Sequence, residues 1–141
     1  KERIHVYMML EDKEYDSKVV EQYRPLIMNH EYMIYKTLYH ENVKIPFSII
    51  NKIVVDIDSS MVNFGFFGGI VYTAIIDFIS HDNVFRFKVM NQDRFVEIIE
   101  HLKSLNIEII DNKNILDAYY QYTDRMERNK YFQREFMYKK K

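Results

Sequence analysis

The sequence predicts an all-α fold in which seven or eight short helices surround one buried hydrophobic helix, at about residues 62–80. Residues 61–80 form the longest apolar run of the chain and carry a single charge, at Asp77. Elsewhere, apolar residues recur with the three-to-four spacing of amphipathic helices. With 3 glycines and 2 prolines in 141 residues, the chain is poor in the turn formers that an all-β sandwich needs at regular intervals.

Length and composition narrow the class of protein. A chain of 141 residues predicts a single domain, residues 1–141, large enough to bury a core. Its 48% hydrophobic residues exclude disorder as the overall state. The net charge of −1 gives no bulk electrostatic basis for binding nucleic acid, so nucleic acid is not an expected partner. The absence of cysteine excludes disulfides and thiol chemistry, and it suits an intracellular, reducing compartment.

Several amphipathic helices are expected before the central one. Residues 2–15 carry apolar side chains at helical spacing. A second helix, capped by Asp16 or Ser17, is broken or kinked at Pro25, because proline removes an amide donor. Residues 31–40 predict a third, short helix.

Pro46 opens the next expected helix, residues 47–57. Its apolar side chains recur with three-to-four spacing, although their β-branching leaves a strand possible. These side chains are Ile49, Ile50, Ile53, Val54 and Ile57.

The C-terminal half is more clearly helical after one ambiguous segment. Residues 84–89 alternate between apolar and polar in the manner of a strand, and only there is the helical interpretation in doubt. Residues 94–105 form an apolar helical stripe, and residues 111–114 read as a turn. A short aromatic helix is expected over 115–122, and a basic, amphipathic helix after it.

The motifs of common enzyme classes are missing from the chain. The three glycines lack the order of a phosphate-binding loop, and no nucleophile elbow occurs. The five histidines fall on different segments without ligand spacing, so a metal site is not expected. Asp56 and Asp58 begin like a calcium loop, but Met61 and Phe67 stand where such a loop needs glycine and glutamate. We therefore expect a protein without catalytic residues, metal or cofactor.

Two stretches carry a resemblance to a known family. VNFGFFGGIV, residues 62–71, resembles the first homology region of the Bcl-2 family, whose core reads Val-Asn-Trp-Gly-Arg. IDNKNILDAYYQY, residues 110–122, lies where the second homology region of that family is expected. Asn112 and Tyr122 match this second motif, while residues 113–115 depart from it. The degenerate motifs and short length look most like virus-encoded members of the family.

The resemblance implies a function as well as a fold. Members of the family take the amphipathic Bcl-2 homology 3 (BH-3) helix of pro-apoptotic proteins into a surface groove, through apolar anchors of the bound helix. A relative of this kind would inhibit apoptosis in the host cytoplasm, with the mitochondrial surface as a further location. One alternative is a viral protein of the same fold that binds innate-immune signalling adaptors, and another is a small helical structural or assembly protein whose motif match is accidental. Homodimerisation and membrane association are left open.

The resemblance also assigns residues to the expected groove. Asn63 and Gly65 keep the asparagine and glycine that contact the ligand helix. Phe66 replaces the family arginine, so BH-3 binding should be weak, be selective, or use another positive residue. Alternatively, Phe66 and Phe67 should form a surface for self-association. The other groove residues implied by position are Ile49, Ile50, Ile53, Ile57, Tyr32, Tyr35 and Tyr122.

Overall fold

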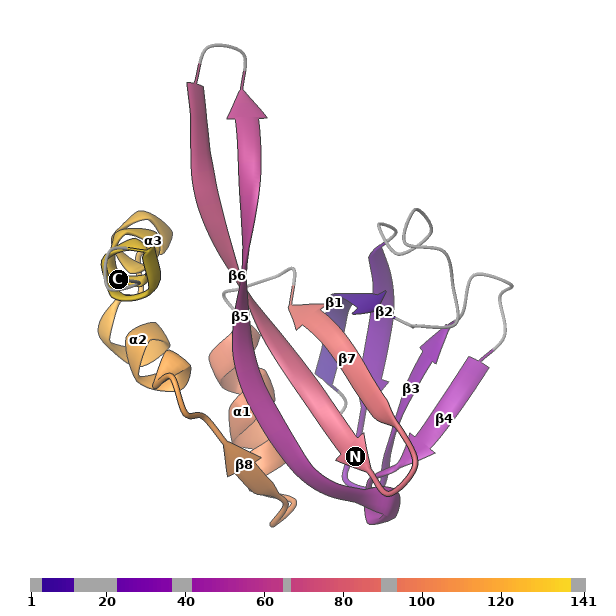
Figure 1. The fold of residues 1–141 in the computed structure, drawn as a ribbon. Coiled ribbons are helices and arrows are strands. Elements are labelled where there is room, and N and C mark those ends of the chain that lie inside the picture. Colours follow the sequence, from indigo (N-terminus) through magenta and orange to yellow (C-terminus); the bar gives the residue numbers. More distant parts are fainter. Residues whose placement is uncertain (1–3, 12–22, 37–41, 65–66, 90–93, 138–141) are drawn as a thin grey trace.

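Figure 1 shows the computed structural model, which describes residues 4–11, 23–36, 42–64, 67–89 and 94–137. These residues form a mixed fold with eight strands in one sheet and three α-helices. In chain order the elements are β1 (Ile4–Glu11), β2 (Tyr23–Met28), β3 (Tyr32–Lys36), β4 (Asn42–Pro46), the 3₁₀ turn η2 (Phe47–Ile49), β5 (Ile50–Phe64), β6 (Phe67–Ser80), β7 (Val84–Val89), α1 (Phe95–Lys103), β8 (Glu108–Ile110), α2 (Ile115–Gln121), α3 (Arg125–Phe132) and its π-helical extension η4 (Gln133–Met137).

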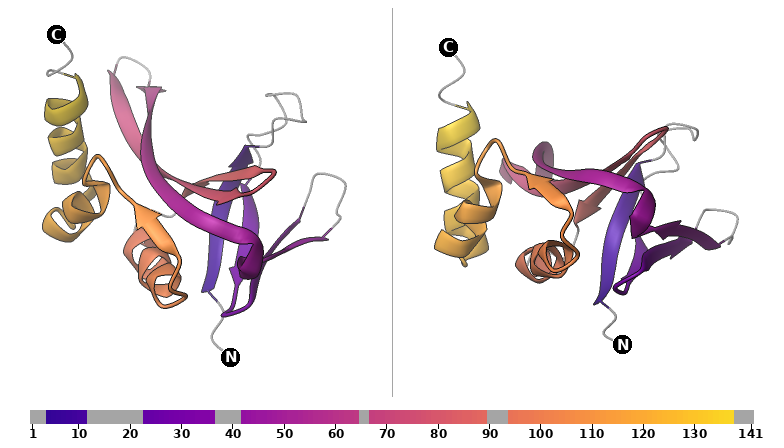
Figure 2. Two further views of the ribbon diagram at one scale, coloured as in Figure 1. Left: turned by 60° about the horizontal axis from the view of Figure 1, so that its bottom comes forward. Right: turned by 90° about the horizontal axis from the view of Figure 1, so that it is seen from below.

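The strands follow the order β4-β3-β2-β1-β7-β6-β5-β8 across the sheet. Every neighbouring pair is antiparallel except β5 and β8, which run parallel. The two longest strands, β5 and β6, pair along their whole length and extend beyond the rest of the sheet as a twisted two-stranded ribbon (Figure 1). Helices α2 and α3 lie beside this ribbon, and α1 lies beside β8 (Figure 2).

The hydrophobic core joins the two halves of the bent sheet. Tyr35 of β3 packs edge-on against Phe87 of β7, with ring centroids 5.6 Å apart, and Phe87 packs in the same way against Phe78 of β6. The apolar stripe of α1 closes this core, because its residues Phe95, Ile98, Ile99 and Leu102 are all completely buried. The core therefore lies between the sheet and α1, and it does not surround a central helix.

The predicted all-α bundle is wrong, and so is its central helix. Within residues 62–80, the described parts are the end of β5 and all of β6. Strand β6 lies between β5 and β7, and its residues 74–78 are buried on both faces. A strand covered on both faces loses the alternation of polar and apolar residues, and its sequence then resembles a buried helix.

The other N-terminal helices are wrong for a related reason. Within residues 2–15 and 31–40 the described parts are the strands β1 and β3, and the part of the second expected helix that is described is β2. Residues 47–57 form η2 and the start of β5, where Ile53, Val55 and Ile57 point to one face at a spacing of two. Their three-to-four spacing was fortuitous, and their β-branching was the better signal.

Three C-terminal predictions are confirmed, and one open question is answered. Residues 94–105 contain α1, while residues 84–89, whose conformation the sequence left in doubt, form β7. Residues 111–114 include a turn, and residues 115–122 contain α2. The helices agree with the sequence because their apolar stripes are local, whereas each strand depends on distant partners.

Candidate functional site

The distal ribbon, residues 57–64 of β5 and 67–74 of β6, is the part of the sheet that extends beyond its neighbours (Figure 1). Ile57 lies opposite Ala74, Ser59 opposite Tyr72, and Met61 opposite Ile70. Strand β7 pairs with β6 only from Ile75 onward, and β8 pairs with β5 only up to Val54. The ribbon therefore has two edges that no strand among the described residues covers.

The edge of β6 is covered by side chains of α2 and α3. Asn129 donates from Nδ2 to the Ile70 carbonyl oxygen at 2.6 Å, and its Oδ1 accepts from the Tyr72 amide at 3.0 Å. The hydroxyl of Tyr119 hydrogen-bonds the backbone of Ala74. An asparagine side chain offers one acceptor and a donor group, so it can satisfy an edge strand as a neighbouring backbone would. We call Ile70, Tyr72 and Ala74 the closed edge.

Packing of the helices holds these capping groups in place. The Arg128 side chain is only 3% exposed; it lies over the Tyr119 ring, 4.2 Å from its centroid, and donates to the Tyr122 carbonyl oxygen. Burial raises the pKa of Tyr119 to about 12, against the opposing effect of the Arg128 charge. Phe132 contacts the rings of both Tyr119 and Tyr72. The closed edge is thus part of the hydrophobic core.

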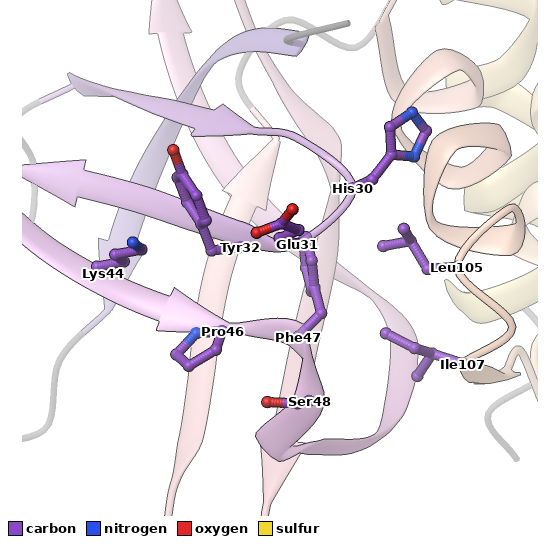
Figure 3. Close-up of a pocket in the computed structure, with 9 residues that line it drawn as sticks. All are labelled: His30, Glu31, Tyr32, Lys44, Pro46, Phe47, Ser48, Leu105 and Ile107. Atoms are coloured by element: carbon purple, nitrogen blue, oxygen red, sulfur yellow. The ribbon is translucent and has the colours of Figure 1, made fainter. Parts of the chain in front are cut away.

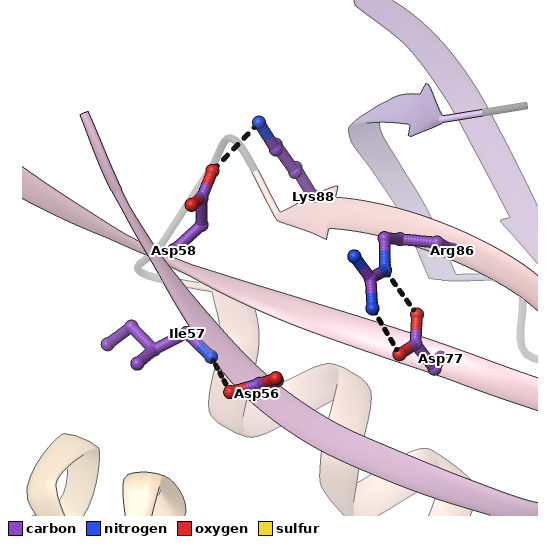
Figure 4. A network of polar contacts seen from close by, with 6 residues as sticks. All are labelled: Asp56, Ile57, Asp58, Asp77, Arg86 and Lys88. Carbon is purple, nitrogen blue, oxygen red and sulfur yellow. Dashed lines mark hydrogen bonds and ion pairs between the residues drawn. The ribbon is translucent and has the colours of Figure 1, made fainter. Parts of the chain in front are cut away.

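The edge of β5 is satisfied only near its base. Strand β8 pairs with residues 52–54, and the Ile57 amide donates to the Asp56 carboxylate at 2.8 Å (Figure 4). Burial would raise the pKa of Asp56, but hydrogen bonds from Lys113 and Ile57 outweigh it and hold that pKa below its usual value. Beyond Ile57, no strand or capping side chain reaches this edge among the described residues.

The pairing of β5 with β6 shows which backbone groups on the β5 edge have no partner among the described residues. In an antiparallel pair of strands, directly opposed residues alternate between two kinds. In one kind the two residues hydrogen-bond each other through both backbone groups, and in the other their amide and carbonyl groups point away from the partner strand. The backbone groups of Ile57, Ile70 and Tyr72 bond side chains outside the ribbon, so these residues belong to the second kind. Ser59 and Met61, which lie opposite Tyr72 and Ile70, therefore belong to the second kind as well. The amides and carbonyls of Ser59 and Met61 therefore point away from β6 and meet no partner strand or capping side chain among the described residues, and Met61 is 77% exposed. We call Ser59 and Met61 the open edge.

Ion pairs fix the base from which the ribbon extends. Arg86 of β7 holds Asp77 of β6 with two hydrogen bonds, of 2.8 and 3.0 Å, and Asp77 is 7% exposed (Figure 4). Lys88 of β7 reaches Asp58 of β5 at 3.0 Å. These contacts cross three strands, so the ribbon begins from a rigid platform.

The predicted groove residues are dispersed over the molecule. Ile50, Ile53 and Tyr35 are buried in the core, whereas Ile49 is exposed in η2. Ile57 and Asn63 lie on the distal ribbon, where Asn63 pairs with Gly68. Tyr32 starts β3, and Tyr122 stacks on Tyr131 at the end of α2, with centroids 5.0 Å apart. Gly65 and Phe66 lie outside the described residues.

A groove between helices is therefore not formed by these residues. The fold that the BH-3 interpretation requires is contradicted, although BH-3 binding itself, like binding to innate-immune adaptors, stays an untested prediction. Among the described residues no three His, Asp or Glu side chains gather to hold a metal ion. None of the described helices is long and apolar enough to cross a membrane.

The sequence reasoning missed the residues that distinguish the two edges, namely Ser59, Met61, Tyr119 and Asn129. These residues matter because one edge of the ribbon is covered and the other is not, and no local sequence pattern indicates which edge is covered. One signal was present: residues 59–76 contain no charge, which is unusual for a strand that leaves the body of a protein.

No family model matches this chain, and no curated protein or solved structure matches it either.

Proposed function

We propose that this chain is a non-enzymatic binding module that captures an extended segment of a partner protein by strand addition along the open edge of β5. One observation carries the proposal: Ser59 and Met61 direct their backbone groups away from β6 and toward no partner among the described residues, while the equivalent groups of β6 are capped. Exposed edge groups of this kind are templates for pairing with another chain.

The chain itself supports the idea that β5 accepts strands. Its own segment β8, only three residues long, pairs with the same edge of β5 nearer the base, at residues 52–54. A partner segment would continue this pairing toward the tip of the ribbon. The rigid base, with its Asp77–Arg86 and Asp58–Lys88 ion pairs, lowers the ordering cost on the side of this chain.

The chemistry of the open edge indicates the partner. Ser59, Ser60 and Met61 are exposed and uncharged, and the nearest acidic groups, Asp56 and Asp58, are both paired with lysines. The bound segment should therefore be extended, free of proline at the bonded positions, and apolar or neutral where it faces the ribbon. Main-chain bonds would supply affinity, and alternate side chains would supply specificity.

The test uses a phage-displayed library of random 12-residue peptides, with the length chosen to exceed the roughly 5–6 residues of a typical strand. Selected peptides are titrated against Met61→Pro and Met61→Ala. Proline removes the outward amide without breaking a β5–β6 bond, so it should weaken binding roughly tenfold. Alanine keeps the amide and should bind nearly as well.

Hydrogen exchange provides a second readout. In the free protein the Ser59 and Met61 amides should exchange faster than those of Ser60 and Val62, and a bound peptide should slow them. The proposal is overturned if no peptide is enriched, or if Met61→Ala abolishes binding while Met61→Pro does not. A concentration-dependent dimer that Met61→Pro dissolves would also overturn it, because a second copy would then occupy the edge.

A further inference from the structure

A pocket of about 590 Å³ lies at the start of β5, far along the strand from the tip of the ribbon. Its walls come from the β2–β3 turn, the ends of β3 and β4, η2, and the loop between α1 and β8 (Figure 3). This volume falls within the range of roughly 300–1,000 Å³ that is usual for small-molecule sites.

The walls of the pocket are held by specific bonds. Asn29 Oδ1 accepts from the amides of Glu31 and Tyr32, at 2.8 and 2.9 Å. The Phe47 amide donates to the Glu31 carbonyl oxygen, which ties η2 to the β2–β3 turn. His101 Nε2 lies 3.0 Å from the Asn29 carbonyl oxygen and joins α1 to the same turn. These bonds hold the β2–β3 turn against η2 and α1 on one side of the pocket.

The pocket combines two opposite charges with an apolar wall. Lys44 Nζ lies 4.1 Å from the centroid of the Tyr32 ring, an arrangement that positions the ammonium group. Neither Lys44 nor Glu31 has an ion-pair partner among the described residues. Leu105 and Ile107 line the opposite side, and Figure 3 shows Glu31 between them and Lys44.

From this arrangement we propose that the pocket binds a free α-amino acid with an apolar side chain. Its carboxylate would pair with Lys44, its ammonium group with Glu31, and its side chain would lie against Leu105 and Ile107. A simple carboxylate would leave Glu31 unpaired, and a simple amine would leave Lys44 unpaired, so the zwitterion fits both charges. This site is independent of the open edge and does not rest on the function proposed above.

The test is a titration of the ¹⁵N-labelled chain with L-leucine, followed at the amides of Tyr32, Phe47 and Ile107. Saturable shifts are expected. The analogues 4-methylpentanoate, which lacks the ammonium group, and 3-methylbutylamine, which lacks the carboxylate, should each bind roughly tenfold more weakly. Glycine, which lacks the apolar body, should also bind more weakly.

Two variants assign the charges. Glu31→Gln should weaken leucine binding and leave the affinity for 4-methylpentanoate unchanged, while Lys44→Gln should weaken leucine binding and leave that for the amine unchanged. Glu108→Gln and Lys103→Gln change exposed residues outside the pocket and serve as matched controls. The proposal is refuted by an absence of saturable shifts up to ~10 mM leucine, by equal binding of the two analogues and leucine, or by equal losses in the control variants.

Discussion

The two edges of the distal ribbon have the same backbone and opposite surroundings. On β6, Asn129 and Tyr119 take the outward groups of Ile70, Tyr72 and Ala74 into a helical layer. On β5, coverage ends at Ile57, and the same kind of groups at Ser59 and Met61 meet no partner among the described residues. The difference shows that the coverage of an edge strand depends on the rest of the fold rather than on the sequence of the strand itself.

The largest effect should come from undocking the helices that close the β6 edge. Phe132 is 1% exposed and packs against Tyr72 and Tyr119, so Phe132→Ala should lower the free energy of unfolding by about 3–5 kcal/mol. Met126→Ala, at a residue 69% exposed on the same helix, should change it by less than about 0.5 kcal/mol. Urea denaturation measures both. Equal effects would show that α3 is not part of the core.

A second test uses the titration of Tyr119. Its pKa is raised from 10.0 to about 12 in the fold, so between these values the unfolded chain loses the phenol proton while the folded chain keeps it. Stability should therefore fall with rising pH, by roughly 1.4 kcal/mol per pH unit from this group. The stability gap between the wild type and Tyr119→Phe, measured in urea at pH 8, 10 and 11, should narrow above pH 10. A constant gap would contradict the burial of this hydroxyl.

A third change opens the closed edge directly. Asn129→Ala leaves the Ile70 carbonyl and the Tyr72 amide without their cap, and it should cost about 1–3 kcal/mol. Lys130→Ala, at the next and exposed position, controls for helix propensity. Hydrogen exchange at the Tyr72 amide should accelerate only in Asn129→Ala. An unchanged rate would mean that another group protects this edge.

The smallest effect is expected on the β5 edge. Asp56→Ala removes both the acceptor of the Ile57 amide and the ion pair with Lys113. Asp56→Asn removes the charge but keeps an oxygen that can accept from the Ile57 amide. Because Asp56 is partly exposed, solvent screening limits the Lys113 pair to less than about 1 kcal/mol. Asp56 has a lowered pKa, so its contribution is present above the unfolded value near 3.8 and is lost as the pH falls through the folded value. Chemical denaturation of both variants at pH 7 and pH 3 checks this, and a difference from wild type that grows toward pH 3 would contradict it.

The sequence correctly indicated those elements whose stabilising contacts are local. The stripe of Phe95, Ile98, Ile99 and Leu102 identified α1, whereas the alternation of residues 84–89 only raised the possibility of the strand that is β7. The sequence did not predict the candidate site, because Ile57 and Asn63 were assigned to a groove between helices rather than to the edge of a strand. Ile57 and Asn63 do lie on the ribbon, but the sequence offered no way to know that Met61 would stand at an open edge and Ile70 at a closed one.

What the sequence determined by itself is a chain with a large apolar content, helices in its C-terminal part, and one long uncharged stretch, residues 59–76. Only the tertiary structure decided that this stretch is a hairpin. Strand pairing is long-range: β6 is paired on both edges because β5 and β7 flank it, and its distal edge is closed because Asn129, far along the chain, reaches it. Helical periodicity is set within a few residues, whereas the partner of an edge strand is set by the whole fold.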